Sequence, residues 1–132
     1  MTSAVPYLLV ALGGALGAVA RVAVGSVFAR RIGIAWPYGT LFINVTGCLA
    51  IGLFLAWSAG RELSPALRYF FPVGFVGAYT TFSTFEYETI QLIAEGGRYR
   101  AAAINLGGSV AAGFLSAYLG VVLARLLMRG RM

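Results

Sequence analysis

Long stretches of this chain carry no charged residue. Four such stretches follow one another along the sequence, at residues 1–20, 32–60, 69–85 and 101–124. About 20 apolar residues cross a bilayer as an α-helix, so the second and fourth stretches are long enough by themselves. The first reaches that length by continuing through Arg21, and the third by continuing past Glu86. The pattern therefore predicts helices that span a membrane.

The expected fold is an all-α membrane protein with four transmembrane helices joined by short loops. Their predicted bounds are about 6–28, 38–59, 69–94 and 101–127. The chain has 132 residues, of which 60% are hydrophobic and 11% are charged, and a soluble domain this small cannot bury so much apolar surface. Residues 1–132 are therefore expected to form a single transmembrane domain.

Composition narrows the function classes further. The chain has no histidine, which is the commonest general base and transition-metal ligand. Its one cysteine, Cys48, lies inside the second predicted span, so no intrachain disulfide can form. Common catalytic, nucleotide-binding and zinc-binding motifs are absent. The net charge of +6 comes from arginines that mostly flank the spans, where they meet lipid headgroups, so we expect neither an enzyme nor a nucleic-acid-binding protein.

Arginines are spread evenly over the two sides of the predicted domain. Five fall on the side of the N-terminus and five on the opposite side; they are Arg61, Arg68, Arg125, Arg129 and Arg131, and then Arg21, Arg30, Arg31, Arg98 and Arg100. Because positive loops prefer the cytoplasm, this balance selects no orientation. Either the balance is accidental, or copies insert both ways and pair as an antiparallel dimer. The small interior of one subunit favours the dimer.

Small residues recur every four positions in the first and fourth predicted helices. Gly13 and Gly17 form a GxxxG pair, and Ala112, Ser116 and Gly120 form a second row. Such rows let helix backbones approach closely in lipid. They are equally consistent with packing inside one subunit and with a seam between two subunits.

Arg21 is a charged residue inside a predicted span. It lies nine residues before Arg30, which is about 13 Å deeper along a helix. It either extends toward the interface or serves as a cation at the floor of an aqueous vestibule, where it would attract anions. The vestibule is favoured, because Arg30 and Arg31 already supply the interfacial charge.

Other polar side chains also fall inside the spans, where they are costly unless they face an interior or a wet cavity. Asn44 is most simply a hydrogen-bond link between two helices, although its amide can also donate to an anion. Asn105, Ser109 and Ser116 share one face of the fourth helix, at spacing i, i+4 and i+11. That face either binds a neighbouring helix or lines a wet path, and both alternatives stay open.

Residues 77–88, GAYTTFSTFEYE, gather hydroxyl groups inside the third predicted span. An unbroken helix would align its phenylalanines into one packing stripe. Against that arrangement, Gly74 and Gly77 precede hydroxyl residues at positions 80, 81, 83 and 84, and this composition lets a membrane helix break. Channels and transporters bind ions at such breaks. The sequence therefore favours a third helix that is broken in the middle of the membrane.

Three segments resemble the signature segments of the Fluc/CrcB family of fluoride ion channels. They are GGALGAVAR (13–21), PYGTLFINVTGCLAIG (37–52) and GFVGAYTTFSTFEYE (74–88). Length, spans and arginine pattern agree across the whole chain, and GAY at 77–79 departs from the more usual Gly-Gly. The resemblance implies a fluoride-selective channel that exports fluoride passively across the cell inner (plasma) membrane. It also implies an antiparallel, dual-topology homodimer with two pores and a structural sodium ion at its two-fold axis.

The resemblance assigns roles to particular residues. Phe82 and Phe85 would line the pore with their ring edges, Asn44 would donate its amide to fluoride, and Arg21 would be the vestibule cation. Gly77 and Thr80 would offer backbone carbonyls to sodium. The remaining candidates for the fluoride pathway are Glu88 as the family's pore-associated acid, the hydroxyl groups of Thr81, Ser83 and Thr84, and on the fourth helix Ser109, with Asn105 after it.

Aromatic ring edges carry positive partial charge and hydroxyls donate weakly, so together they compensate a dehydrated anion without trapping it. One rival class is the small multidrug exporters, which are also four-span, dual-topology dimers. Those exporters carry an acidic residue in the first helix, where this chain has Arg21. Another rival is a non-transporting assembly subunit, for which the arginine balance would be incidental.

Overall fold

The computed structural model describes residues 4–129, and all regular secondary structure in that part of the chain is helical. In chain order the elements are α1 (Val5–Arg31), α2 (Tyr38–Ser58), α3 (Pro65–Arg68), the π-helix η1 (Tyr69–Val76), α4 (Gly77–Tyr79), α5 (Phe82–Ala94) and α6 (Tyr99–Arg129). The expectation of an all-α fold is confirmed. Arg131, which entered the arginine balance, lies outside the described residues.

Three helices of the described chain are long and apolar enough to cross a membrane. They are α1, α2 and α6, with 27, 21 and 31 residues. Their bounds agree to within three residues with the predicted spans 6–28, 38–59 and 101–127. Hydropathy located these helices correctly because each contains a long apolar stretch with few charged residues.

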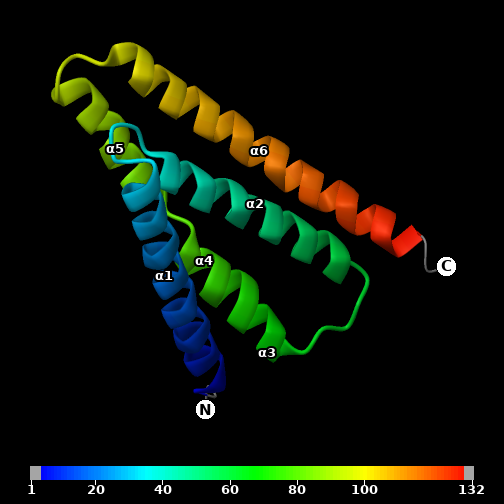
Figure 1. Cartoon of the computed structure of the whole chain (residues 1–132). Coiled ribbons are helices and arrows are strands. Elements are labelled where there is room, and N and C mark those ends of the chain that lie inside the picture. The colour runs from blue at the N-terminus through cyan, green and yellow to red at the C-terminus, as the bar shows by residue number, and fades with distance from the viewer. Residues whose placement is uncertain (1–3, 130–132) are drawn as a thin grey trace.

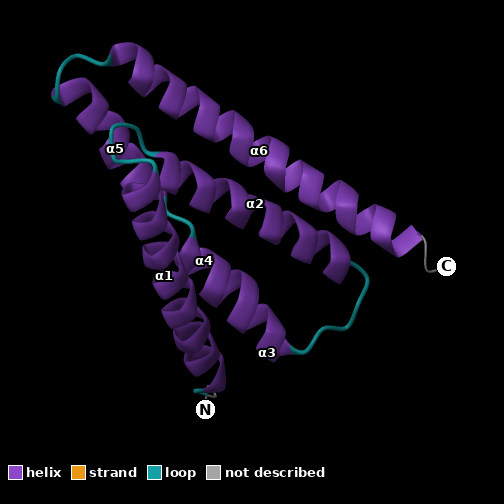
Figure 2. Cartoon of the chain, viewed as in Figure 1, coloured by secondary structure: helices purple, strands orange, loops and turns teal. Residues whose placement is uncertain are grey.

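The long helices are arranged in two pairs. Figure 1 shows α2 lying along α6, while α1 lies along the α3–η1–α4 segment. Beyond α4 the chain continues into α5, which packs on the first part of α6. Figure 2 shows that loops join the helix ends, with one further interruption between α4 and α5.

The third predicted span, 69–94, consists of several short elements. Pro72 lies inside η1, where it removes a backbone donor, and the helix there takes π geometry. After α4 the backbone is extended at Thr80 (φ −74°, ψ 158°) and at Thr81 (φ −150°, ψ 115°). A new helix, α5, begins at Phe82. The depth of this interruption in a bilayer stays a prediction.

Both rows of small residues contain glycines that pack against another helix of the same chain. A methyl group on Gly13 or Gly17 would overlap the backbone carbonyl of Phe70 or Phe75 on η1. On α6, a methyl group on Gly120 would lie 2.5 Å from the carbonyl oxygen of Leu49, so α2 and α6 also meet backbone to backbone. Of the two alternatives for these rows, the structure has packing within one subunit.

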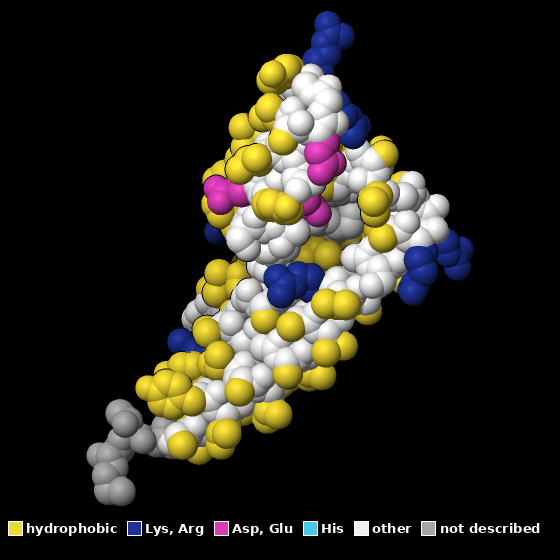
Figure 3. Space-filling model, turned by 90° about the vertical axis from the view of Figure 1, so that its left-hand side faces the viewer, with side chains coloured by type: hydrophobic (Ala, Val, Ile, Leu, Met, Phe, Trp, Pro, Cys, Tyr) yellow, Lys and Arg dark blue, Asp and Glu magenta, His cyan; other side chains and the backbone are white. Residues whose placement is uncertain are grey.

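The outer surface of the described chain is strongly apolar. Large hydrophobic side chains stay more than half exposed on all three long helices, among them Leu16, Leu55 and Leu115 at 55%, 56% and 68%. Figure 3 shows hydrophobic side chains over much of one face, with the acidic side chains gathered in its upper part. Such a surface suits lipid or another protein rather than water.

Candidate functional site

The interruption between α4 and α5 is clamped by one side chain of α2. The Thr81 backbone N–H donates to Oδ1 of Asn44 at 2.8 Å, and Nδ2 of Asn44 donates to the Thr81 carbonyl at 3.0 Å. The carboxamide thus replaces the helical partners that Thr81 loses where its backbone is extended. Asn44 is therefore a hydrogen-bond link between helices, which is one of the two roles predicted for it. Nδ2 carries a second N–H that the bond to Thr81 does not use, so the role of Asn44 as an anion donor stays a prediction.

Other residues of α2 next to Asn44 also contact the interruption between α4 and α5. Gly47 lies against Thr80, and a methyl group at Gly47 would overlap Cγ2 of that threonine. The Thr46 hydroxyl lies 2.9 Å from the Tyr79 hydroxyl, and it donates to the Phe42 carbonyl at 2.7 Å. The tetrapeptide NVTG (44–47) is thus a docking site for the interruption, which explains why asparagine and glycine stand three residues apart.

Several carbonyl groups lose their usual helical donors at the interruption, among them those of Gly77 and Thr80. In a continuous α-helix the N–H of Thr81 would bond to the Gly77 carbonyl, but here it donates to Asn44. The N–H of Thr84 would bond to the Thr80 carbonyl, but it donates to Oγ1 of Thr81 at 3.3 Å, which caps α5. Gly77 and Thr80 are the two residues predicted to offer carbonyls to sodium.

A cavity of about 570 Å³ adjoins the interruption, and we call it the break cavity. It is bounded by α2, by the segment from η1 to α5 and by α6. Seven residues singled out in the sequence line it together: Asn44, Gly77, Thr80, Thr81, Phe82, Phe85 and Ser109. The structure thus brings together residues from three separate parts of the sequence.

Phe82 and Phe85 meet in the wall of the break cavity. Their ring centroids are 5.7 Å apart and the ring planes are inclined by 46°. The two residues share a helix face because they stand three apart. Phe85 is 4% exposed, whereas Phe82 is 68% exposed in the single chain. One ring is therefore fixed by packing, and the other is presented on an open surface.

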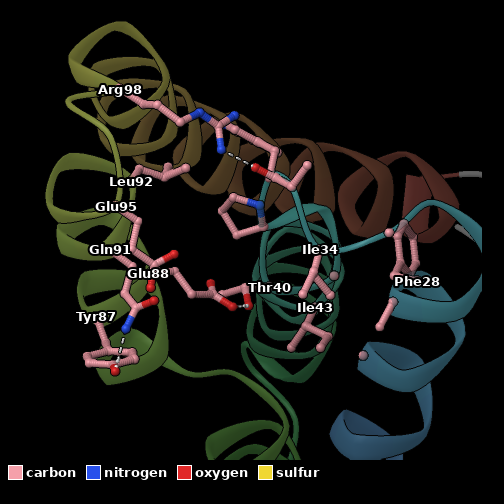
Figure 4. A pocket seen from close by; sticks show the side chains of 17 residues that line it. Phe28, Ile34, Thr40, Ile43, Tyr87, Glu88, Gln91, Leu92, Glu95 and Arg98 are labelled. Carbon is pink, nitrogen blue, oxygen red and sulfur yellow. Dashed lines mark hydrogen bonds between the residues drawn. The ribbon is translucent and has the colours of Figure 1, made fainter.

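A second cavity, of about 420 Å³, lies beneath residues 32–37, and we call it the loop cavity (Figure 4). Inside it the Thr40 hydroxyl donates to Oε1 of Glu88 at 2.9 Å. Oε2 of Glu88 is buried and has no hydrogen-bond partner among the described residues. At the rim, Nη1 of Arg98 donates to the Ala35 carbonyl at 2.6 Å, which ties the α1–α2 loop to the start of α6.

The two cavities follow one another along α2 and α5. On α2 the loop cavity ends at Ile43 and the break cavity begins at Asn44. On α5 the break cavity ends at Phe85 and the loop cavity begins at Tyr87. Buried Ile43 and Phe85, 3% and 4% exposed, thus stand where one cavity gives way to the other.

Other predicted residues lie outside the break cavity. Ser83 and Thr84 are exposed and do not line it, although the Thr84 hydroxyl accepts a hydrogen bond from the Thr81 hydroxyl at 2.9 Å. Arg21 lines neither cavity, but it stands one turn before Gly25, a lining residue of the loop cavity. Their pore roles stay predictions.

Asn105 does not line the break cavity either. It is 1% exposed and donates from Nδ2 to Oγ1 of Thr89 on α5 at 2.8 Å. Ser116, on the same face of α6, donates to the Val45 carbonyl at 2.8 Å. For these two residues the face binds a neighbouring helix, whereas Ser109 lines a cavity.

Sequence reasoning missed several residues of the site. Thr40, Thr46, Gly47 and Thr89 each contact a predicted residue or the interruption itself. One signal was available, because Thr40 stands one turn before Asn44 and so shares its helix face.

Comparisons with known proteins identify relatives of this chain. The family described as CrcB-like protein, Camphor Resistance (CrcB), matches residues 8–121. A protein of Acidobacterium capsulatum named fluoride-specific ion channel FluC is 55% identical over 88% of this chain and 93% of its own length. Proteins of the same name from Trichormus variabilis and Nitrobacter winogradskyi are 44% and 52% identical, over 93% and 78% of this chain and 90% and 82% of their own lengths.

These matches cover almost the whole described chain, from α1 to α6. They include both cavities and the NVTG docking site. Together with three helices able to span a membrane, they make the protein a multi-pass membrane protein. The chain therefore belongs to the CrcB-like family, a family of ion channels and not of enzymes.

Proposed function

We propose that this protein is a fluoride-selective channel that lets fluoride leave the cell passively across the inner (plasma) membrane. The observation that carries the proposal is the break cavity, where Phe82, Phe85, Asn44 and Ser109 line one space beside an interrupted helix. Relatives at up to 55% identity are named fluoride-specific ion channels, which fixes the chemistry of the proposed ion.

The groups around the break cavity suit a small anion that must shed water and then leave again. Ring edges of Phe82 and Phe85 carry positive partial charge, and the second N–H of Asn44 is a neutral donor. α5 begins at Phe82, so the positive end of its helix dipole lies at the cavity. None of these groups carries a full positive charge, so the site compensates for lost water without holding the anion fast.

The break cavity is continued by the loop cavity in our proposal. Glu88 lies there beside Thr40, and Arg21 faces the same side of α1 as Gly25 in the cavity wall. An anion attracted by Arg21 would approach through the loop cavity and pass Ile43 and Phe85 to reach the break cavity. This path uses the acid and the cation that the sequence singled out.

A second, antiparallel copy would complete the pore. The break cavity is open on one side, and its lining residues Phe82, Val110 and Phe114 stay 68%, 47% and 77% exposed. Because exposed apolar side chains beside a polar site are typical of a protein–protein contact, we place the partner subunit on this face. Two equivalent cavities would then give two pores per dimer, with the third span, residues 69–94, broken near the middle of the membrane.

A structural sodium ion suits two of the carbonyls that lose their helical donors. Gly77 and Thr80 both line the break cavity, and both would turn a bare carbonyl toward a two-fold axis on that face. Bound there, sodium would supply the positive charge that lets carbonyl dipoles from two subunits converge. The residues present therefore suit a monovalent cation held by backbone oxygen.

The proposal is tested with purified protein in liposomes loaded with fluoride. A fluoride-sensitive electrode outside the liposomes should record rapid efflux once the membrane potential is dissipated with a potassium ionophore, and little chloride efflux under matched conditions. Protein-free liposomes are the control. Efflux no faster than in that control would refute the function. Equal rates for fluoride and chloride would refute the selectivity.

A further inference from the structure

A buried chain of hydrogen bonds links α6 to the backbone of Phe85. The Ser109 hydroxyl donates to Oδ1 of Asn105 at 3.3 Å, and Nδ2 of Asn105 donates to Oγ1 of Thr89 at 2.8 Å. The Thr89 hydroxyl in turn donates to the Phe85 carbonyl at 2.7 Å. All three donors point the same way, from the cavity wall of α6 toward the buried phenylalanine of α5.

Asn105 occupies the middle of this chain and is 1% exposed. A buried carboxamide is retained only when its polar atoms are paired, and here both ends are paired. Its two partners lie on different helices, because Ser109 is one turn along α6 and Thr89 is on α5. Asn105 therefore fixes the rotation of α5 about its own axis relative to α6, and that rotation sets where the Phe85 ring points.

The hydroxyl of Ser109 forms the other end of this chain of hydrogen bonds. Ser109 lines the break cavity, but its single hydroxyl hydrogen is directed to Asn105 and is therefore not offered to the cavity. Lone pairs repel an anion, whereas the hydrogen would attract one. At 3.3 Å the bond is long and weak, so rotation of the hydroxyl toward an anion breaks little.

We propose that Asn105 is a positioning residue of the anion path, which orients Phe85 through Thr89 and holds the Ser109 hydrogen until a passing anion draws it into the cavity. The inference rests on the proposed function, because it assigns a role within the same fluoride pathway. Asn105 acts from behind the wall of the break cavity and does not touch the ion.

The experiment compares fluoride efflux and thermal stability for three single variants and one double variant in the same liposomes and detergent. Asn105→Leu removes the link, Thr89→Val removes its α5 partner with little change of shape, and Thr89→Ser keeps the hydroxyl. The double variant Asn105→Leu with Thr89→Val leaves no polar group unpaired between the helices, so it should melt close to the wild-type protein.

Efflux should fall about tenfold in Thr89→Val and in the double variant, which corresponds to about 1.4 kcal/mol in the barrier, the size of one hydrogen bond. Thr89→Ser should conduct like the wild type. The fluoride concentration that gives half-maximal efflux should fall in Asn105→Leu, because the Ser109 hydroxyl is then free to donate to the anion, and a purely structural role would not move that concentration.

Wild-type efflux from the double variant would overturn the inference. So would losses of efflux that merely follow the amount of folded protein. A wild-type protein that carries no fluoride would overturn the proposed function and the inference together, whereas a conducting wild type with equally conducting variants would overturn the inference alone.

Discussion

Replacement of Asn44 by leucine tests the clamp on the interrupted helix. The side chain makes two hydrogen bonds to the backbone of Thr81, at 2.8 and 3.0 Å. Leucine has a similar size but neither donor nor acceptor, so the variant removes both bonds at once. The Thr81 N–H and carbonyl then lose their partners in a residue that is 7% exposed.

The expected destabilisation follows from those two groups. Each buried backbone group left without a partner costs about 1–3 kcal/mol, which gives about 2–6 kcal/mol for the pair. Removal of the partly buried carboxamide itself offsets some of this loss, so we expect the lower half of the range, about 2–4 kcal/mol. A loss of that size is a large share of the stability of a small domain.

The free energy of unfolding is measured by denaturant titration in detergent, followed through the fluorescence of Trp36 and Trp57 at the two ends of α2. Ser58→Ala is the matched control. Its hydroxyl donates to the Leu55 carbonyl at 3.0 Å on the exposed end of the same helix, so its removal should change stability by less than about 0.5 kcal/mol.

The reasoning would be refuted if Asn44→Leu and Ser58→Ala had the same free energy of unfolding. That result would mean that the interruption is held by its neighbours and not by the clamp. Fluoride efflux from the surviving folded fraction adds a second readout, because a displaced interruption should lower efflux further than the loss of folded protein explains.

Three further outcomes are expected. Gly17→Ala should destabilise the protein by about 1–3 kcal/mol, since its methyl group meets the Phe75 backbone, whereas Gly25→Ala meets nothing within 4 Å and should be neutral or stabilising in the same titration. Phe82→Ile keeps an apolar side chain but removes the ring edge, so it should lower fluoride efflux in liposomes with little change in the melting temperature of the solubilised protein; an unchanged efflux would mean that the ring serves only for packing. Exchange of sodium for a bulky organic cation should weaken the dimer in cross-linking assays and stop efflux, with recovery on return of sodium; indifference to the exchange would exclude the cation site.

Much of the fold follows from the sequence because lipid imposes a simple rule. A helix that crosses a membrane must be apolar over most of its length, so α1, α2 and α6 were visible as long apolar stretches with few charged residues. Glycines and hydroxyls likewise marked the segment where Thr80 and Thr81 are extended. These are local properties, and local composition is sufficient to predict them.

The remaining features depend on contacts between distant residues. Asn105 and Thr89 are 16 positions apart, and Thr40 and Glu88 are 48 apart, so neither bond leaves a periodic signal. Rotation about the axis of α5 decides that Phe82 and Phe85 face the break cavity while Ser83 does not. The start of that helix fixes the rotation, and a sequence gives helix starts less precisely than helix cores.

The hydrogen bond between Arg98 and Ala35 has a consequence for protein engineering. It fastens the α1–α2 loop to the beginning of α6, and Nε1 of Trp36 adds a second link to the Ala101 carbonyl at 3.5 Å. The loop between α2 and α3, at residues 59–64, is almost entirely exposed. Its backbone hydrogen bonds join residues that are close in the sequence. An affinity tag or fluorescent label inserted near Glu62 should therefore be tolerated, whereas one placed at residues 33–36 would separate two halves of the domain.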